Sequence, residues 1–394
     1  MTLLPGYKRK DTGIPRPPIP GRADPAASAA RARQREPVSL LLGRNSAILL
    51  FAGFIIVFGL IKPNPFLSET TFQITFQQGV VTAIVALAFL VPLIAGIYDL
   101  SVGQMMGFSL VIMNWFNSYH PGVPVGLVAV GAIIVCAIVG LFSGLLIVRF
   151  RVNSLIATLG MSELLQALQL RLSNNEQVSA GFPSSFVKAG NGDLLGIPYL
   201  TIYLLAIAVV MWFVLEQTPL GRRMMAVGGN RDAAKLVGIK SNRVIWGSLV
   251  TSGAVAAVAG VMYTMQVGAY TADIGSQYLF PALAAVFFGA SQLSQRPNVW
   301  GTLLAFFALA FGIQGLTLQF GAGTFWVNPL FQGVALILAV GVASTRGSIG
   351  RGRDGQAVRR VLRRSDAPPA PGEAADKEMG QAAASEASRV RADK

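Results

Sequence analysis

The 394-residue sequence has one cysteine and one histidine, so it almost lacks the residue types that most metal sites and nucleophilic enzymes need. Cys136 has no second cysteine with which to form a disulfide within the chain. His120 has no second histidine with which to hold a metal ion or to carry acid–base chemistry. No G-x-x-x-x-G-K-S/T string occurs, so the chain has no phosphate-binding loop for ATP. We therefore expect no catalytic residues, no metal site and no cofactor bound by this chain.

Charge is also scarce, since 13% of the residues are charged and 53% are hydrophobic. A soluble domain carries about 25% charged residues. The net charge of +14 fits nucleic-acid binding in principle. However, the basic residues cluster at the two ends and between apolar runs, which favours a membrane protein with no nucleic-acid partner. The first 44 residues lack an apolar core, so they do not read as a cleavable signal peptide.

The apolar runs predict an all-α polytopic membrane protein with about ten transmembrane helices, because a crossing needs about 20 mostly apolar residues. The eighth run is too short to cross upright. The predicted spans are 45–61, 79–97, 101–117, 126–148, 153–172, 199–215, 244–267, 280–291, 299–320 and 329–342.

The positions of lysine and arginine predict the orientation of these spans. With ten spans, both tails and the basic stretch 222–243 fall on one side of the membrane. Few basic residues fall on the other, and they are Lys62, Arg171 and Lys188. Both termini are therefore expected in the cytoplasm, and the loop from Asn174 to Asp193 outside. The chain divides into a disordered basic tail (1–44), a transmembrane domain (45–345) and a second disordered tail (346–394).

The stretch "GGNRDAAKLVGIKSNRV" (228–244) interrupts the apolar runs on the predicted cytoplasmic side. Asn230 is a good N-cap and Gly238 a natural stop, so about two turns of helix are expected between them. Ala233, Leu236 and Val237 form one small apolar face at helical spacing. So short a helix is not stable alone. It must lie either on lipid headgroups or against another protein.

Three motifs resemble one family. "DAAKLVG" (232–238) is similar to the EAA-x-x-x-G loop of ABC importer permeases. The longer string from Thr218 to Val244 is similar to a pattern of the monosaccharide (ribose-type) branch of these permeases. That pattern is GR-x-x-x-A-x-GGN-x-x-AA-x-x-x-GI-x-x-x-R. "GIYDLSVGQ" resembles that family's GIDLSVG, and "GLLIVRFRVNSLIATLG" its NGLLVARLRIPPFIATLG. Together these matches cover roughly residues 46–342. A branched-chain-amino-acid-type permease is the alternative within the superfamily.

The resemblance implies a permease subunit of an ATP-driven importer in a bacterial cytoplasmic membrane. The short cytoplasmic helix would be a coupling helix that seats in a separate ABC ATPase subunit, which would use the ATP. An extracytoplasmic solute-binding protein would deliver solute, and two permease copies would form a homodimer in the bilayer with the solute path between them. The residues implied in ATPase coupling are Gly228, Gly229, Asn230, Asp232, Ala233, Ala234, Leu236, Gly238 and Ile239.

Polar residues within the apolar runs are candidates for the solute path. Asp99 and Ser101 either cap the third span or face the path, and both roles are compatible. Glu163, Gln166 and Gln169 in the fifth span either form a hydrated wall or hydrogen-bond to neighbouring helices. Gln314 completes the candidates, since the family often has Asn nearby.

Two other classes of protein compete with this interpretation. An ion-coupled secondary transporter would need intramembrane acids, for which only Asp99 and Glu163 qualify. A membrane scaffold or enzyme is disfavoured by the missing catalytic groups.

Overall fold

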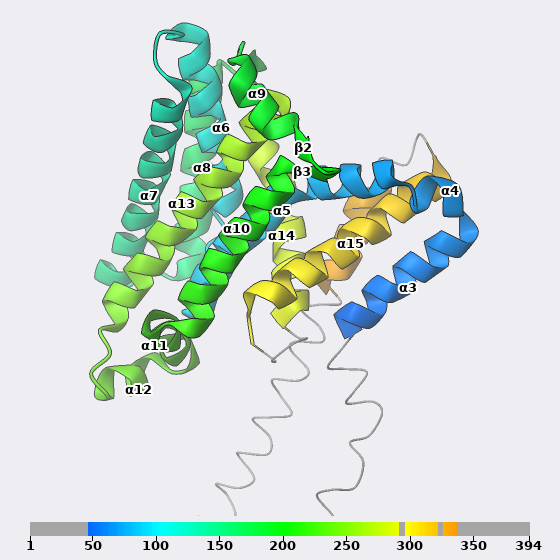
Figure 1. Ribbon diagram of the computed structural model, residues 1–394. Helices are drawn as coiled ribbons and strands as arrows, with labels where there is room; N and C mark the ends of the chain where they lie inside the picture. The colour runs from blue at the N-terminus through cyan, green and yellow to red at the C-terminus, as the bar shows by residue number, and fades with distance from the viewer. Residues whose placement is uncertain (1–45, 291–295, 322–325, 338–394) are drawn as a thin grey trace, which may run out of the picture.

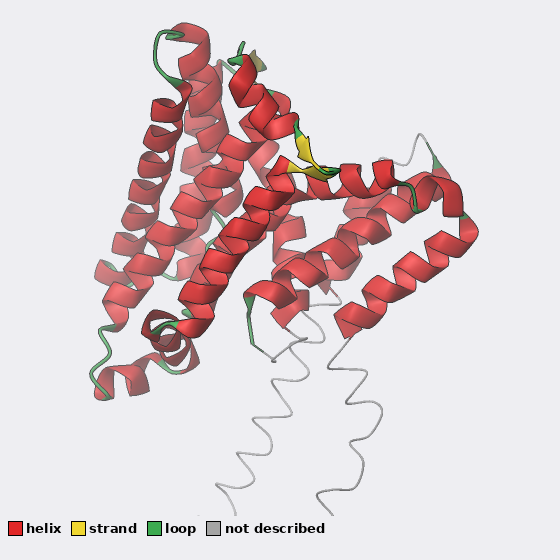
Figure 2. Ribbon diagram, in the orientation of Figure 1, coloured by secondary structure: helices red, strands yellow, loops and turns green. Residues whose placement is uncertain are grey.

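The computed structural model describes residues 46–290, 296–321 and 326–337. Helices account for most of this part of the chain, beside two very short two-stranded sheets (Figure 2). The expected all-α class is therefore confirmed. The two predicted tails, 1–44 and 346–394, lie outside the described residues, as do residues 338–342 of the last predicted span.

The chain forms the following elements in order. They are α3 (Ser46–Ile61), α4 (Pro63–Phe66), α5 (Glu69–Ile94), α6 (Val102–Tyr119), α7 (Val125–Arg149), α8 (Ser154–Ser173), β1 (Val178–Ser179), α9 (Ser184–Asn191), β2 (Asp193–Leu194), β3 (Ile197–Pro198), α10 (Tyr199–Trp212), the π-helical η1 (Phe213–Gln217), α11 (Pro219–Gly229), α12 (Arg231–Leu236), α13 (Ser241–Val267), β4 (Ala269–Tyr270), α14 (Ile274–Ala290) and α15 (Val299–Phe320). A last helix, Val327–Ile337, follows.

Among the described residues, five helices are long and apolar enough to cross a membrane: α5, α7, α10 with η1, α13 and α15. The helix α3, the helix α14 and the last helix are apolar but shorter. Each predicted span coincides at least in part with a helix. The multi-pass membrane class is thus supported, while the count of ten crossings stays a prediction.

Two spans begin more than a helical turn earlier than their apolar runs predicted. The helix α5 begins at Glu69 rather than at residue 79, because the Ser68 side chain caps it by accepting from the backbone N–H of Thr71. The helix α14 begins at Ile274 rather than at residue 280, and it contains Pro281. In both cases polar side chains in the first turns hide the helix from a hydropathy pattern.

The helix α5 lies at the centre of the molecule, and its residues Val80 to Val91 are almost fully buried. It packs against α13, α14 and α15. The helix α13 also lies closely against α7, where a Cβ on Gly140 would overlap the backbone of Leu249. A small residue at position 140 thus allows close helix packing.

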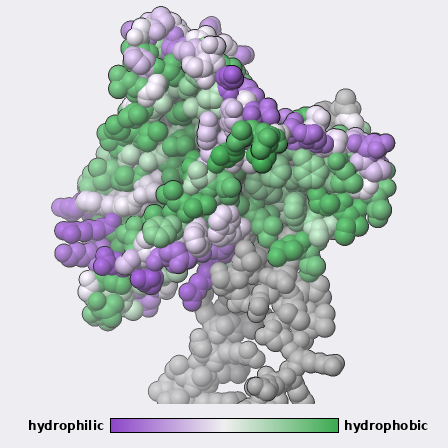
Figure 3. Space-filling model, in the orientation of Figure 1, coloured by the Kyte–Doolittle hydropathy of each residue, from purple (hydrophilic) through white to green (hydrophobic). Residues whose placement is uncertain are grey.

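The two ends of the bundle differ in what they carry. The helices α11 and α12 lie together at one end, whereas α9 and the β2–β3 hairpin lie at the other (Figure 1). Apolar side chains cover much of the surface between these ends, and polar ones gather toward them (Figure 3). This distribution fits a bilayer around the middle of the helices.

Candidate coupling segment and polar cavity

The candidate coupling segment, called the coupling segment below, consists of α11, Asn230 and α12. Thr218 caps α11 by accepting from the backbone N–H of Leu220, and Pro219 occupies the first helical position. The helix α11 ends at Gly229, so Gly228 and Gly229 belong to its last turn and not to the short helix that follows.

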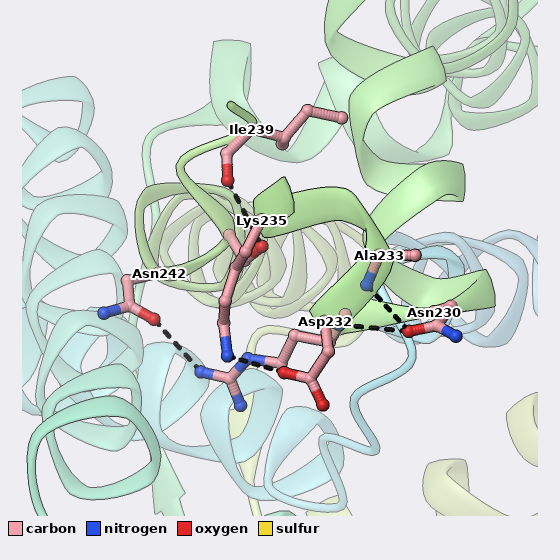
Figure 4. A network of polar contacts seen from close by, with 8 residues as sticks. Asn230, Asp232, Ala233, Lys235, Ile239 and Asn242 are labelled. Atoms are coloured by element: carbon pink, nitrogen blue, oxygen red, sulfur yellow. Dashed lines mark hydrogen bonds and ion pairs between the residues drawn. The ribbon is translucent and has the colours of Figure 1, made fainter. Parts of the chain in front are cut away.

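The helix α12 has the predicted start and stop. The Asn230 side-chain oxygen accepts from the backbone N–H groups of Asp232, at 3.1 Å, and Ala233, at 3.0 Å (Figure 4). Gly238 has φ +83°, a left-handed conformation that glycine adopts at low cost. The backbone N–H of Gly238 donates to the Lys235 carbonyl, which closes the helix end.

Lys235 and Asp232 form an ion pair of 2.8 Å on the outer surface of α12. The hydrogen bond from Lys235, together with its charge, holds the pKa of Asp232 below its ordinary value. Exposed pairs of this kind contribute little to stability. The pair therefore adds little to the stability of α12, whose ends are determined by the Asn230 cap and by Gly238.

The two alanines of α12 have different environments. Ala234 is 3% exposed and packs in a cluster with Ile97, Val227 and Ile245 of the same chain. Leu236, in contrast, is 90% exposed and Val237 76% exposed, and Ala233 is also exposed. Ala234 thus anchors α12 to the bundle, while the predicted apolar face of Ala233, Leu236 and Val237 has no partner in the described part of the chain.

The coupling segment also contacts the C-terminal end of α5. A Cβ on Gly228 would overlap the carbonyl oxygen of Ile94, and a Cβ on Gly96 would lie 3.0 Å from the Cα of Gly228. Gly229, by comparison, has open space around it. The backbones of α11 and of the α5–α6 link therefore touch directly.

Asp99 lies in this same link and is fully buried. Its carboxylate accepts from the backbone N–H and the hydroxyl of Ser101, and from the Ser252 hydroxyl of α13 at 2.8 Å. Ser101 is the N-cap residue of α6 but makes no side-chain cap of its own. The predicted cap of the third span by Asp99 or Ser101 is therefore wrong, because no side chain accepts from the first-turn N–H groups of α6. Asp99 instead bonds to Ser101 and ties the link to α13.

The predicted polar residues of α8 have different environments. Gln169 is 1% exposed and donates to the Gln104 side chain of α6 at 2.7 Å, while Gln166 donates to Asp273 at 3.2 Å. Glu163 lies on the exposed face of α8. Gln169 therefore serves helix packing in this structure. Asp99 and Glu163 do not form a paired acid site.

A cavity of about 740 Å³ lies between α5, α13, α14, α15 and the last helix. The predicted path residue Gln314 lines it, whereas Asp99, Glu163, Gln166 and Gln169 do not. Sequence reasoning missed the other amides in its wall, although each stands inside or beside an apolar run. The amide side chains that line the cavity are Gln78, Gln266, Gln277, Gln314, Asn328 and Gln332.

Comparisons with known proteins identify the family. The family described as "Branched-chain amino acid transport system / permease component" matches residues 72–340. The chain belongs to this permease family. The matched region includes the coupling segment, the α5–α6 link and the residues around the cavity.

Characterised relatives cover most of the chain. The ribose import permease protein RbsC of Haemophilus influenzae is 30% identical over 77% of this chain and 92% of its own length. The L-arabinose ABC transporter permease protein AraH of Azospirillum brasilense is 30% identical over 80% of this chain and 92% of its own length. The autoinducer 2 import system permease protein LsrD of Salmonella typhimurium is 28% identical over 75% of this chain and 89% of its own length. No solved structure matches the chain.

Proposed function

We propose that this chain is the permease subunit of an ATP-driven ABC importer that moves a monosaccharide across the bacterial cytoplasmic membrane. The observation that carries the proposal is the capped helix α12, where Leu236 and the following Val237 are exposed beside a buried anchor, Ala234. A helix lying on lipid headgroups is the alternative for this segment. The names of the ribose and L-arabinose relatives support the sugar class.

The partners follow from this role. A separate ABC ATPase supplies the energy and docks on α12, and an extracytoplasmic binding protein delivers the solute. Two copies of the permease form the homodimer, each with ten crossings and both termini in the cytoplasm. The chain itself binds no nucleotide. A branched-chain amino acid remains the alternative solute.

The contacts of α12 provide a route for mechanical coupling. ATP binding closes the ATPase subunits and displaces the docked helix. Ala234 contacts the cluster that contains Ile97, and Gly228 abuts Ile94, so the displacement reaches the end of α5. Because α5 is central and packs against several spans, its movement shifts the walls of the cavity.

The test is to purify the importer with Leu236→Asp or Val237→Asp in the permease. We expect both variants to insert into the membrane, to lose the co-purifying ATPase and to lose ATP-dependent sugar uptake, because a charge replaces an apolar contact. Leu195→Asp is the matched control, since Leu195 is 95% exposed at the opposite end of the bundle. Full ATPase binding and uptake in both α12 variants would contradict the proposal and favour the lipid interpretation.

A further inference from the structure

The cavity lies in the half of the molecule away from α12. The C-terminal end of α5 contacts the coupling segment, and the cavity is lined by Thr75 and Gln78 near the other end of that helix. The helix α13 starts shortly after α12, and Gln266 at its far end also lines the cavity. With α12 in the cytoplasm, the cavity occupies the outer half of the membrane, where an imported solute arrives.

The wall of the cavity offers hydrogen bonds that the protein does not use. Within the described residues, the side chains of Gln78, Gln277 and Gln314 make no hydrogen bond to another protein group. Gln266, by comparison, donates to the Gln77 carbonyl at 3.3 Å. Amides at membrane depth are costly unless they face a partner or a water-filled space. Gln78 and Gln277 are exposed and Gln314 is half-buried, so the three amides are free to bond to a solute in the cavity.

The chemistry of the wall limits the class of ligand. None of the described residues that line the cavity carries a charge. An amino acid would bring an ammonium group and a carboxylate into a site with no counter-charge. A sugar has hydroxyls that both donate and accept, as amides do, and the rings of Tyr263 and Tyr278 supply apolar surface for its C–H groups. The cavity volume is within the usual range of small-molecule sites.

We propose that this cavity is a binding site for a neutral polyhydroxylated solute on its way through the permease, with Gln78, Gln277 and Gln314 as its hydrogen-bonding groups. The proposal rests on the proposed importer function and deepens it. It also separates sugars from branched-chain amino acids on the basis of the permease itself.

The test uses single cysteines in the full importer in membrane vesicles, with Cys136→Ala as the background. Thr82→Cys and Ala310→Cys, which line the cavity without being among its three proposed hydrogen-bonding groups, are labelled with a small uncharged thiol reagent in the presence of D-ribose, L-arabinose or L-leucine. Gln319→Cys is the matched control, because Gln319 is exposed on the same helix as Ala310 and does not line the cavity. We expect a transported sugar to slow labelling at both cavity positions, about tenfold at 90% occupancy, and not at Gln319→Cys.

The outcomes distinguish the two levels of the proposal. If a sugar is imported by ATP-dependent uptake but protects neither cavity position, the binding site is wrong and the importer function stands. Equal slowing at Gln319→Cys would also overturn the site. If L-leucine is imported and protects both positions while the sugars do neither, the solute class is wrong in both proposals.

Discussion

The Cα of Gly228 in α11 lies so close to the carbonyl oxygen of Ile94, at the end of α5, that no Cβ fits between them. Two helices far apart in the sequence therefore meet backbone to backbone, at the point where the coupling segment reaches the central helix. Such a contact involves no long side chains that change rotamer, and it makes residue 228 sensitive to a single methyl group.

Gly228→Ala is therefore expected to weaken the importer where Gly229→Ala does not. The added methyl at residue 228 forces α11 away from α5, and overpacking of this kind costs about 1–3 kcal/mol. At residue 229 the methyl enters open space at the end of a helix. Thermal unfolding of the detergent-purified protein, together with ATP-dependent uptake, measures the difference. Equal melting temperatures and equal uptake in the two variants would mean that the contact between Gly228 and Ile94 matters neither for stability nor for transport.

Gly238 tests the stop of α12 by backbone conformation alone. Its φ of +83° is unfavourable for a β-branched residue, and space around a Cβ there is open, so any effect of substitution comes from the backbone. Gly238→Val is expected to distort the end of α12, at a cost of about 1–2 kcal/mol, and to reduce ATPase binding. Gly238→Asn should retain binding, because asparagine adopts left-handed conformations more readily. Pull-down of the ATPase compares them, and identical loss in both would point to a side-chain effect instead.

How far the sequence predicted this structure depends on the scale of the feature. The Asn230 cap and the Gly238 stop were predictable because each is determined by local backbone geometry. The burial of Ala234 and the exposure of Ala233 were not predictable, since they depend on where Ile97 and Ile245 pack. The early start of α5 was missed because its first turns carry polar side chains.

The cavity shows the same limit. Gln314 was a candidate by resemblance, but nothing local in the sequence connects it with Gln78, which lies on a different helix. Conversely, Gln169 has the same side chain as Gln314 yet is buried against Gln104. Whether an amide in a membrane helix lines a cavity or bonds to a neighbouring helix is decided by tertiary packing.

Asp99 is expected to be a positioning residue at the junction of the α5–α6 link with α13. Asp99→Ala leaves the Ser101 and Ser252 donors buried without their acceptor, at a cost of about 1–3 kcal/mol for each unsatisfied group. Asp99→Asn keeps an oxygen that accepts from Ser101, so it should lose much less. Melting temperatures in detergent compare the two variants, with Ser252→Ala expected in between. A stable Asp99→Ala protein that lacks transport would instead assign Asp99 to the solute path.

The orientation of the chain is testable with two leucines that lie at opposite ends of the bundle and are almost fully exposed. Leu195 is 95% exposed in the turn of the β2–β3 hairpin, and Leu236 is 90% exposed on α12. With Cys136 buried and replaced by alanine, a membrane-impermeant thiol reagent should label Leu195→Cys in intact spheroplasts and Leu236→Cys in inside-out vesicles alone. The charge distribution predicts this result, because basic residues crowd the α11–α12 end. Labelling of Leu236→Cys from outside the cell would contradict the predicted orientation and place α12 outside. The coupling helix would then be out of reach of any cytoplasmic ATPase.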